Sequence, residues 1–164
     1  MSSTTALAVV PDRRPVALAE WRNAFGWSPS IWNRMIRHLD LGPSWFDDDA
    51  LNLLWSSWEQ YEPWVQVPLI LTFDTGVIPW QHFTWAAEML DEFEARLPEA
   101  EGRANHAPLV ARLLHSCPEV PFFGVWGTSV SENPFDPWDN AQDDYGSGIP
   151  MAEMFVFTPA GQSA

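Results

Sequence analysis

The chain has 164 residues, of which 46% are hydrophobic and 18% charged. Its basic residues are eight arginines and no lysine, against 22 Asp and Glu, so the formal net charge at pH 7 is −14. The hydrophobic content excludes a disordered acidic tail, and a charge of this sign repels phosphate backbones and anionic membranes. The length fits one domain with a real core.

The charge is unevenly distributed along the chain. Residues 1–39 contain five arginines and two carboxylates, a net charge of +3, whereas residues 40–164 contain three arginines and twenty carboxylates, a net charge of −17. Of the eleven tryptophans, we expect most in the core and two or three on a contact surface, because Trp is enriched at binding hot spots. Cys117 is the single cysteine and can form no internal disulfide, which suits a reducing compartment.

The first half of the chain reads mainly as helix. Residues 1–16 predict a flexible lead-in. Residues 17–26 and 29–40 predict two helices, the second with apolar residues at helical spacing. A third helix is expected over 47–60, since the opening acidic triplet is favourable at a helix N-terminus. The apolar run over 67–73 predicts a strand.

The second half of the chain mixes helices and strands. A long amphipathic helix is expected over 80–97 and a shorter helix over 107–116. A second strand is expected over 122–130, followed by a long loop over 131–150 with turn residues throughout. A third strand is expected over 154–158.

This order predicts an α+β fold with N-terminal helices packed against a small mixed three-stranded sheet in the order β-α-α-β-loop-β. The first strand pair, joined through helices, is expected to be parallel, and the last pair antiparallel. We expect a flexible segment over 1–16, a single acidic α+β domain over 17–159 and a frayed C-terminus over 160–164.

Residues 18–39 (LAEWRNAFGWSPSIWNRMIRHL) resemble a helix-turn-helix DNA-binding unit. The resemblance implies that polar residues of the second helix face a major groove and its phosphates; these would be Ser28, Ser30, Asn33, Arg34 and Arg37. An ordinary helical hairpin is the alternative, because a Ser-Pro helix start after Gly is also common there.

The segment Asp74-Thr75-Gly76 after an apolar run resembles the Asp-Thr-Gly signature of aspartic proteases. The resemblance implies that two such Asp residues share a proton and activate water; with one copy here, a homodimer would have to supply the second. Val77 stands where that family has a small residue, and a long helix is expected soon after. A turn that caps a helix is the alternative, and we expect no protease activity.

His106, His115 and Cys117 do not have the spacing of a structural zinc site. The pair Gly124 and Gly127 lacks the Gly-Lys-Ser/Thr of a phosphate-binding loop. We therefore expect neither a metal nor a cofactor.

The stretch 131–145 interleaves five carboxylates with three aromatic residues and contains no basic residue. The spacing is not that of an EF-hand calcium loop. It is either a solvated loop without a role or a surface that presents acidic and aromatic anchors to a basic protein. The residues expected to bind a partner are Asp47, Asp48, Asp49, Asp91, Glu94, Glu132, Asp136, Trp138, Asp139, Asp143, Asp144 and Tyr145.

The composition predicts a cytosolic, acidic inhibitor or immunity-type protein that occupies a cationic, nucleic-acid-binding surface of a partner, such as a nuclease. In composition it resembles DNA-mimicking anti-defence proteins of phages and immunity proteins against nuclease toxins. A transcriptional regulator that binds DNA through residues 18–39 is the first alternative, and a phage or assembly structural protein is the second. No residue cluster is typical of an enzyme, and no segment approaches the ~20 apolar residues that a membrane helix needs.

Overall fold

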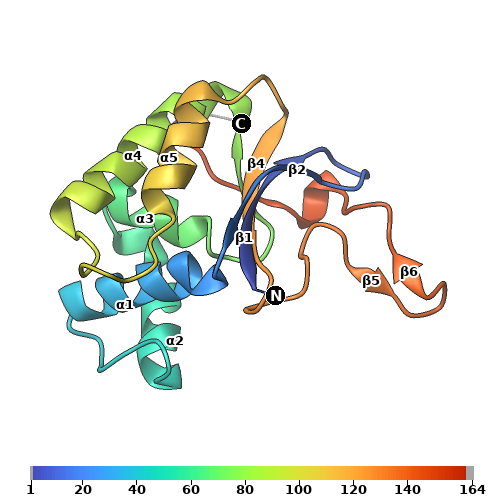
Figure 1. Cartoon of the computed structure of the whole chain (residues 1–164). Helices are drawn as coiled ribbons and strands as arrows, with labels where there is room; N and C mark the ends of the chain where they lie inside the picture. Colours follow the sequence, from blue (N-terminus) through green and yellow to red (C-terminus); the bar gives the residue numbers. More distant parts are fainter. Residues whose placement is uncertain (1, 162–164) are drawn as a thin grey trace.

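The computed structural model describes residues 2–161. A mixed sheet of five strands, in the order β2-β1-β4-β3-β7, lies in the middle of the molecule, with the helices on one side of it (Figure 1). The strands of this sheet are β1 (Ser3–Val9), β2 (Val16–Arg22), β3 (Gly76–Pro79), β4 (Phe122–Gly127) and β7 (Phe155–Val156). The helices are α1 (Ser28–His38), α2 (Asp48–Ser56), α3 (Pro63–Ile70), α4 (Phe83–Arg96) and α5 (Ala107–Ser116).

The α+β class is confirmed, although the sheet has five strands rather than three. Strand β1 is antiparallel to both β2 and β4, and β4 is antiparallel to β3. Strand β7 is parallel to β3. The expected parallel first pair is therefore wrong, because residues 67–73 form no strand and β3 is antiparallel to β4. The last two expected strands, β4 and β7, run in opposite directions as expected, but β3 lies between them and they do not pair.

The prediction of a flexible segment over 1–16 is wrong for Ser3–Val9. This stretch is β1, and all seven of its residues are buried. It pairs with a neighbour on each side, so the chain start contributes a central strand. Of the C-terminal segment expected to fray, residues 162–164 lie outside the described residues.

Two elements have the opposite type from the one expected. Residues 17–26 were expected to be helical, but Val16–Arg22 is strand β2 at the sheet edge. Its Ala, Leu and Glu residues favour helices, but pairing with β1 overrides this intrinsic propensity. Residues 67–73 were expected to form a strand, but Pro63–Ile70 is helix α3. Six of its eight residues are buried, so it has no polar face to reveal a helical period.

The remaining helices confirm the periodicity of the sequence. Helix α1 begins with a proline in its first turn, and Arg37 and His38 lie in its last turn, where positive charge is favourable. Asp47 caps α2, because its carboxylate accepts hydrogen bonds from the amides of Asp49 and Ala50 at 3.0 and 3.3 Å. Helices α4 and α5 and strand β4 also occur where they were expected.

The sheet separates two apolar cores. On the helix side, Ala6, Ile78 and Phe123 pack with the helices. On the other side, neighbouring strand residues such as Leu7 and Phe122 pack against side chains of the chain after β4, which are Phe135, Ile149 and Met154. Residues 131–150, which were expected to form a loop, therefore also cover the second face of the sheet.

Gly124 allows this cover to approach the sheet closely. A Cβ at this position would lie 2.7 Å from the ring of Phe135, so the absence of a side chain makes room for a ring that is only 1% exposed. As expected, most tryptophans pack in or against the cores, and two, Trp80 and Trp138, are exposed by more than 40%.

Candidate functional site

The residues expected to bind a partner lie in three separate places: the start of α2, the surface of α4 and the stretch 131–145. At the start of α2, Asp47 acts as the helix cap. Asp48 and Asp49 are exposed in the first turn, where they favour the helix through its dipole. This acidic triplet thus has a structural role in the helix itself.

The two carboxylates expected on α4 already have partners. Asp91 lies 2.8 Å from Nε2 of His115 on α5, and Glu94 forms an ion pair with Arg34 of α1. Glu94 also accepts a hydrogen bond from the side-chain amide of Asn105 at 2.9 Å. These contacts hold α4 to α5 and α1. Glu94 in particular has a structural role, because both of its carboxylate oxygens are bonded within the protein.

The helix-turn-helix hypothesis is wrong. The first element of residues 18–39 is a strand rather than a helix, and the side chain of Arg34 is only 2% exposed. Its guanidinium donates to the carbonyl of Leu97 at 3.0 Å and to Oδ1 of Asn105 at 3.0 Å, and it lies 4.6 Å from the centre of the Phe93 ring. It cannot reach a nucleic acid phosphate from this position.

Three further residues expected at a DNA groove also belong to the interior or to local contacts. Ser28 and Ser30 are buried, and the Ser30 hydroxyl donates to Oε2 of Glu99 at 2.6 Å. Asn33 accepts a hydrogen bond from the amide of Trp45 at 2.9 Å. Arg37 alone of the five is exposed.

Glu99 completes the cluster around Arg34, from which it lies 3.7 Å. Burial by itself raises the pKa of Glu99, but hydrogen bonds from the Ser30 hydroxyl and the Ala100 amide, together with the charges of Arg34 and Arg37, lower it overall. The carboxylate is therefore stabilised in its charged form, as a structural ion-pair network requires.

The resemblance to aspartic proteases is also not supported by the fold around Asp74. Helix α3 precedes Asp74-Thr75-Gly76 where that family has a strand, and Asp74 is exposed in the turn before β3. Gly76 is required here, since a Cβ would lie 2.1 Å from the carbonyl oxygen of Ile70. The motif is a tight helix-to-strand turn.

The candidate metal ligands lie apart along α5. His106 and His115 stand at opposite ends of this helix, roughly 13 Å from each other at 1.5 Å per residue. His106 is buried with Nδ1 2.7 Å from the hydroxyl of Thr4, and burial lowers its pKa. Burial raises the pKa of the Cys117 thiol. Within residues 2–161, no three His, Cys, Asp or Glu side chains are grouped as a metal ion requires.

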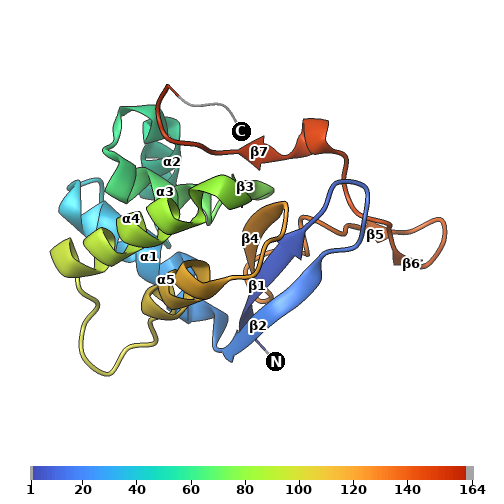
Figure 2. The same cartoon turned by 90° about the horizontal axis from the view of Figure 1, so that it is seen from above.

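The third place is a protrusion, which we call the arm and define as residues 137–147. Its short strands β5 (Trp138–Asp139) and β6 (Asp144–Tyr145) form an antiparallel hairpin. The hairpin projects from the side of the sheet opposite the helices in both views (Figures 1 and 2). Trp138 and Tyr145 are 43% and 42% exposed and lie edge to face, with ring centres 5.2 Å apart.

Three of the five carboxylates of the arm and its root are exposed. Asp143 and Asp144 are exposed, as is Glu132 at the root. Asp139 is half-buried. Its carboxylate accepts hydrogen bonds from the amides of Ala141 and Gln142 and so stabilises the turn. The arm thus displays two aromatic rings among carboxylates.

Arg14 anchors the arm from the turn between β1 and β2. Its guanidinium donates to the carbonyls of Tyr145 at 2.7 Å and Gly146 at 3.1 Å. It also lies 3.6 Å from the carboxylate of Asp136 and 3.4 Å from that of Asp144. These contacts fix the root of the arm to the sheet.

Asp136 was expected to face a partner but is buried at the root of the arm. Burial raises its pKa, and the charge of Arg14 offsets only part of this effect. Its Oδ1 has no hydrogen-bond partner within the described chain. The residue therefore holds the arm in place and is not part of its contact surface.

A groove of about 460 Å³ lies between the arm and the end of β4. Three aromatic side chains line it, Trp126, Trp138 and Tyr145, together with Glu132 and residues 128–131. The indole N–H of Trp126 donates to the carbonyl of Ser131 at 2.9 Å, which fixes one wall. The groove combines apolar faces with a carboxylate at its rim.

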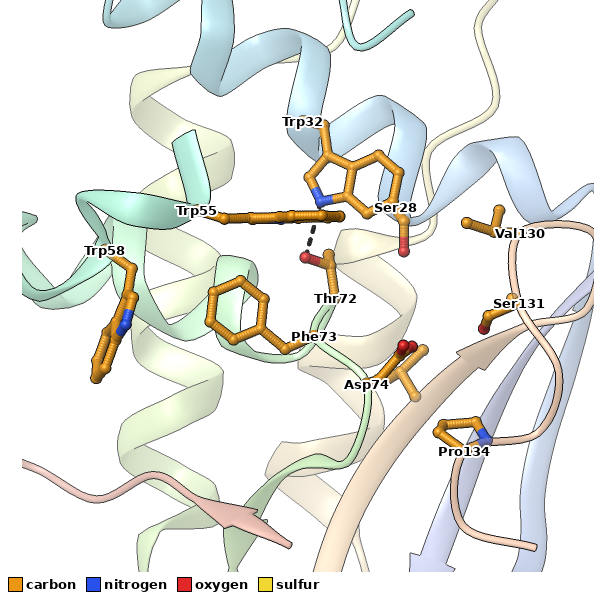
Figure 3. A pocket seen from close by; sticks show the side chains of 12 residues that line it. Ser28, Trp32, Trp55, Trp58, Thr72, Phe73, Asp74, Val130, Ser131 and Pro134 are labelled. Atoms are coloured by element: carbon orange, nitrogen blue, oxygen red, sulfur yellow. Dashed lines mark hydrogen bonds between the residues drawn. The ribbon is translucent and has the colours of Figure 1, made fainter. Parts of the chain in front are cut away.

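A second cavity of about 500 Å³ lies on the other side of residues 130–131, toward the helices (Figure 3). Aromatic side chains of α1, α2 and the turn after α3 form one end of it. Asp74, Ser28 and Ser131 direct their oxygens into the same space at the other end. Its lining residues are Ser28, Trp32, Trp55, Trp58, Thr72, Phe73, Asp74, Val125, Gly127, Val130, Ser131 and Pro134.

Sequence reasoning identified the arm but missed several residues that build these sites. Arg14 was assigned to a flexible segment, and no local pattern connects Trp32 with Trp55. Their convergence depends on long-range packing. One feature of the sequence indicated the anchor. No basic residue follows His115, so any cation that pairs with the acidic arm must come from an earlier part of the chain.

Comparisons with known proteins add no assignment: no family model, curated protein or solved structure matches this chain. None of the helices described for residues 2–161 has the length and apolar character needed to cross a membrane.

Proposed function

We propose that this protein acts by binding, in the cytosol, as an acidic inhibitor or immunity-type protein that occupies a cationic surface of a partner protein. The arm is the contact element. The observation that carries the proposal is the exposure of Trp138 and Tyr145 among the carboxylates of Glu132, Asp143 and Asp144, in a chain with a net charge of −14.

The two kinds of side chain have different parts in binding. The carboxylates attract a basic partner over long range and take the place of phosphates against its Arg and Lys side chains. The two aromatic rings supply short-range affinity, because large rings dominate the energy of many interfaces. A surface that normally binds nucleic acid offers the matching pattern of positive charge.

The anchoring of the arm supports this role. A loop that is disordered before binding loses affinity when it is ordered. Here Arg14 and the buried Asp136 hold the root, and Phe135 packs on the sheet. The arm therefore presents its rings in a preformed arrangement.

The test is capture of binding proteins from nuclease-treated lysate of the native host, read by mass spectrometry. Wild type is compared with Trp138→Ala/Tyr145→Ala and with Glu132→Gln/Asp143→Asn. We expect wild type to retain a strongly basic protein at low salt and to release it at high salt. Each ring removed should weaken binding by about 2 kcal/mol, roughly 30-fold.

A matched control removes an exposed ring elsewhere. Phe46 is 75% exposed and stacks on Trp45 with ring centres 4.2 Å apart. The variant Phe46→Ala should capture the same partner as wild type. Equal capture by wild type and the arm double variant would contradict the proposal.

A second candidate function, as a subunit of an assembly, rests on this same Phe46 patch. Phe25 is 49% exposed beside Trp45, with ring centres 6.3 Å apart, so three aromatic side chains adjoin on one surface. Light scattering after size exclusion distinguishes the two. Self-association of wild type that is lost in Phe46→Ala would favour the assembly role, and a monomer in both would favour the arm.

A further inference from the structure

The cavity between the helices and residues 130–134 holds an unpaired negative charge. Asp74 is the one charged residue among its lining residues. Its carboxylate forms no ion pair and no side-chain hydrogen bond with residues 2–161, and it points into the cavity (Figure 3). Asp74 is exposed, so its free carboxylate can pair with a positively charged group that enters the cavity.

A second, independent feature of this cavity also points to a ligand. Ser28 is only 6% exposed, and its hydroxyl forms no hydrogen bond within the described chain while it points into the same space as Asp74 (Figure 3). The hydroxyl oxygen is not among the fully buried unpaired atoms of residues 2–161, so it stays accessible to water or to a ligand in the cavity. Ser131 directs its hydroxyl to this space from the opposite side. The polar end therefore offers one carboxylate and two hydroxyls to a hydrogen-bond donor.

The other end of the cavity is aromatic. Trp55 lies edge to face with Trp32, with ring centres 5.5 Å apart, and edge to face with Phe73 at 6.2 Å. The indole N–H of Trp32 already donates to the hydroxyl of Thr72 at 2.8 Å, so Trp32 presents its ring and not its donor to a ligand. Rings of Trp attract cations most strongly among aromatic side chains.

The other ligand classes fit less well. An anion would meet Asp74 and the overall negative charge. A calcium ion requires six to eight oxygen ligands, whereas one carboxylate and two hydroxyls converge here. The volume of about 500 Å³ is within the range of small-molecule sites and is large enough for an alkyl chain with a charged end.

We propose that this cavity binds an organic cation, namely a guanidinium or ammonium group on an alkyl chain. The charged group pairs with Asp74 and donates to Ser28 and Ser131, and the alkyl chain lies along Trp32, Trp55 and Phe73. The source is either a free small molecule or an Arg or Lys side chain of a protein. The site is separate from the contact surface of the arm and stands without the proposed function.

The test is titration of the ¹⁵N-labelled full-length chain, followed through the indole N–H signals, which separate individual tryptophans. Agmatine is the free cation, and a short acetylated, amidated oligoarginine is the side-chain source. We expect saturable shifts of the Trp32 and Trp55 signals. Micromolar binding of agmatine indicates a small-molecule site, and micromolar binding of the peptide with millimolar binding of agmatine indicates a protein side chain.

Two variants with the same change in net charge make the test specific. Asp74→Asn should weaken binding of the better probe by at least about tenfold, because it removes a charged hydrogen-bond acceptor. The Asp74 side chain forms no hydrogen bond or ion pair within residues 2–161, so the fold should persist. Asp40→Asn, an exposed position outside both the cavity and the arm, should bind the probe as wild type does.

The proposal is overturned if neither probe gives a saturable shift up to about 10 mM. It is equally overturned if Asp74→Asn and wild type bind alike. Failure of the arm experiment leaves this result unaffected, since the variants of the two experiments lie in different sites.

Discussion

Replacing Arg34 by alanine should destabilise the protein strongly, although the resemblance to a helix-turn-helix unit implies a DNA-facing position for this residue. The side chain is 2% exposed and lies between Glu94 and Glu99, whose side chains are 18% and 6% exposed. The substitution would leave two largely buried carboxylates without their cation. It would also remove the hydrogen bonds to Leu97 and Asn105.

The magnitude follows from this burial. Removing one partner of a buried ion pair costs about 3–5 kcal/mol, because the remaining charge stays buried and unpaired. For a chain of this length, 1 kcal/mol corresponds to about 2–4 °C in Tm. The expected decrease in Tm is therefore roughly 6 to 20 °C. Domains of this size are stable by about 5–15 kcal/mol, so the variant should fold but with a reduced margin.

Urea unfolding followed by tryptophan fluorescence measures this loss, and Arg37→Ala is the matched control. Arg37 lies on the same helix but is exposed, with one hydrogen bond to the carbonyl of Asn33 at 3.3 Å. Its removal should change the free energy of unfolding by less than about 0.5 kcal/mol. A loss below about 1 kcal/mol for Arg34→Ala, or equal losses for both variants, would refute the reasoning.

Two further predictions concern the anchor of the arm and the acid response. Gly148 has a φ of +98°, and a Cβ there would lie 2.0 Å from the carbonyl oxygen of Arg13, so Gly148→Ala should cost about 1–3 kcal/mol. The Asp12 amide donates to the neighbouring carbonyl of Ile149 at 2.8 Å, so its hydrogen exchange should accelerate in this variant, and unchanged exchange would contradict the anchor. The pKa of Glu99 is lowered from its ordinary value of 4.5, so its contribution to stability is present above that pH and is lost as the pH falls through the folded-state pKa. The Ser30 hydroxyl favours the charged form of Glu99, so the difference in free energy of unfolding between wild type and Glu99→Gln should shrink from pH 6 to about pH 3. A difference that stays constant over this range would contradict the predicted role of the Glu99 charge.

The sequence predicted helices best where one face is apolar and the other is polar. Helices α1, α4 and α5 have this pattern. Helix α3 lacks it because the core surrounds it, and it contains Pro68, a residue that is unfavourable in a helix interior. Buried helices and buried strands look alike over a short apolar run.

The two N-terminal strands were missed for a different reason. Strand β1 is partly polar, and its three leading residues, Ser3, Thr4 and Thr5, are buried polar side chains. Strand β2 contains residues that favour helices in isolation. Both are held by long-range pairing, which local propensity does not record.

The candidate site was predictable in its exposed part only. The acidic and aromatic pattern of the arm is local, so Trp138 and Tyr145 could be found by reading along the chain. Their anchor, Arg14, lies more than 120 residues away, and Asp136 is turned inward by packing. The aromatic cavity joins α1, α2 and the turn after α3, which no local pattern connects.

The most direct test of the central claim is the salt dependence of the affinity between this protein and the basic partner that it captures. The dissociation constant should rise steeply between about 0.05 and 0.5 M salt. Glu132→Gln/Asp143→Asn should bind more weakly at low salt and with a smaller slope, since two charges of the contact are removed. A dissociation constant that does not change with salt, or the same slope for the variant and wild type, would contradict the account.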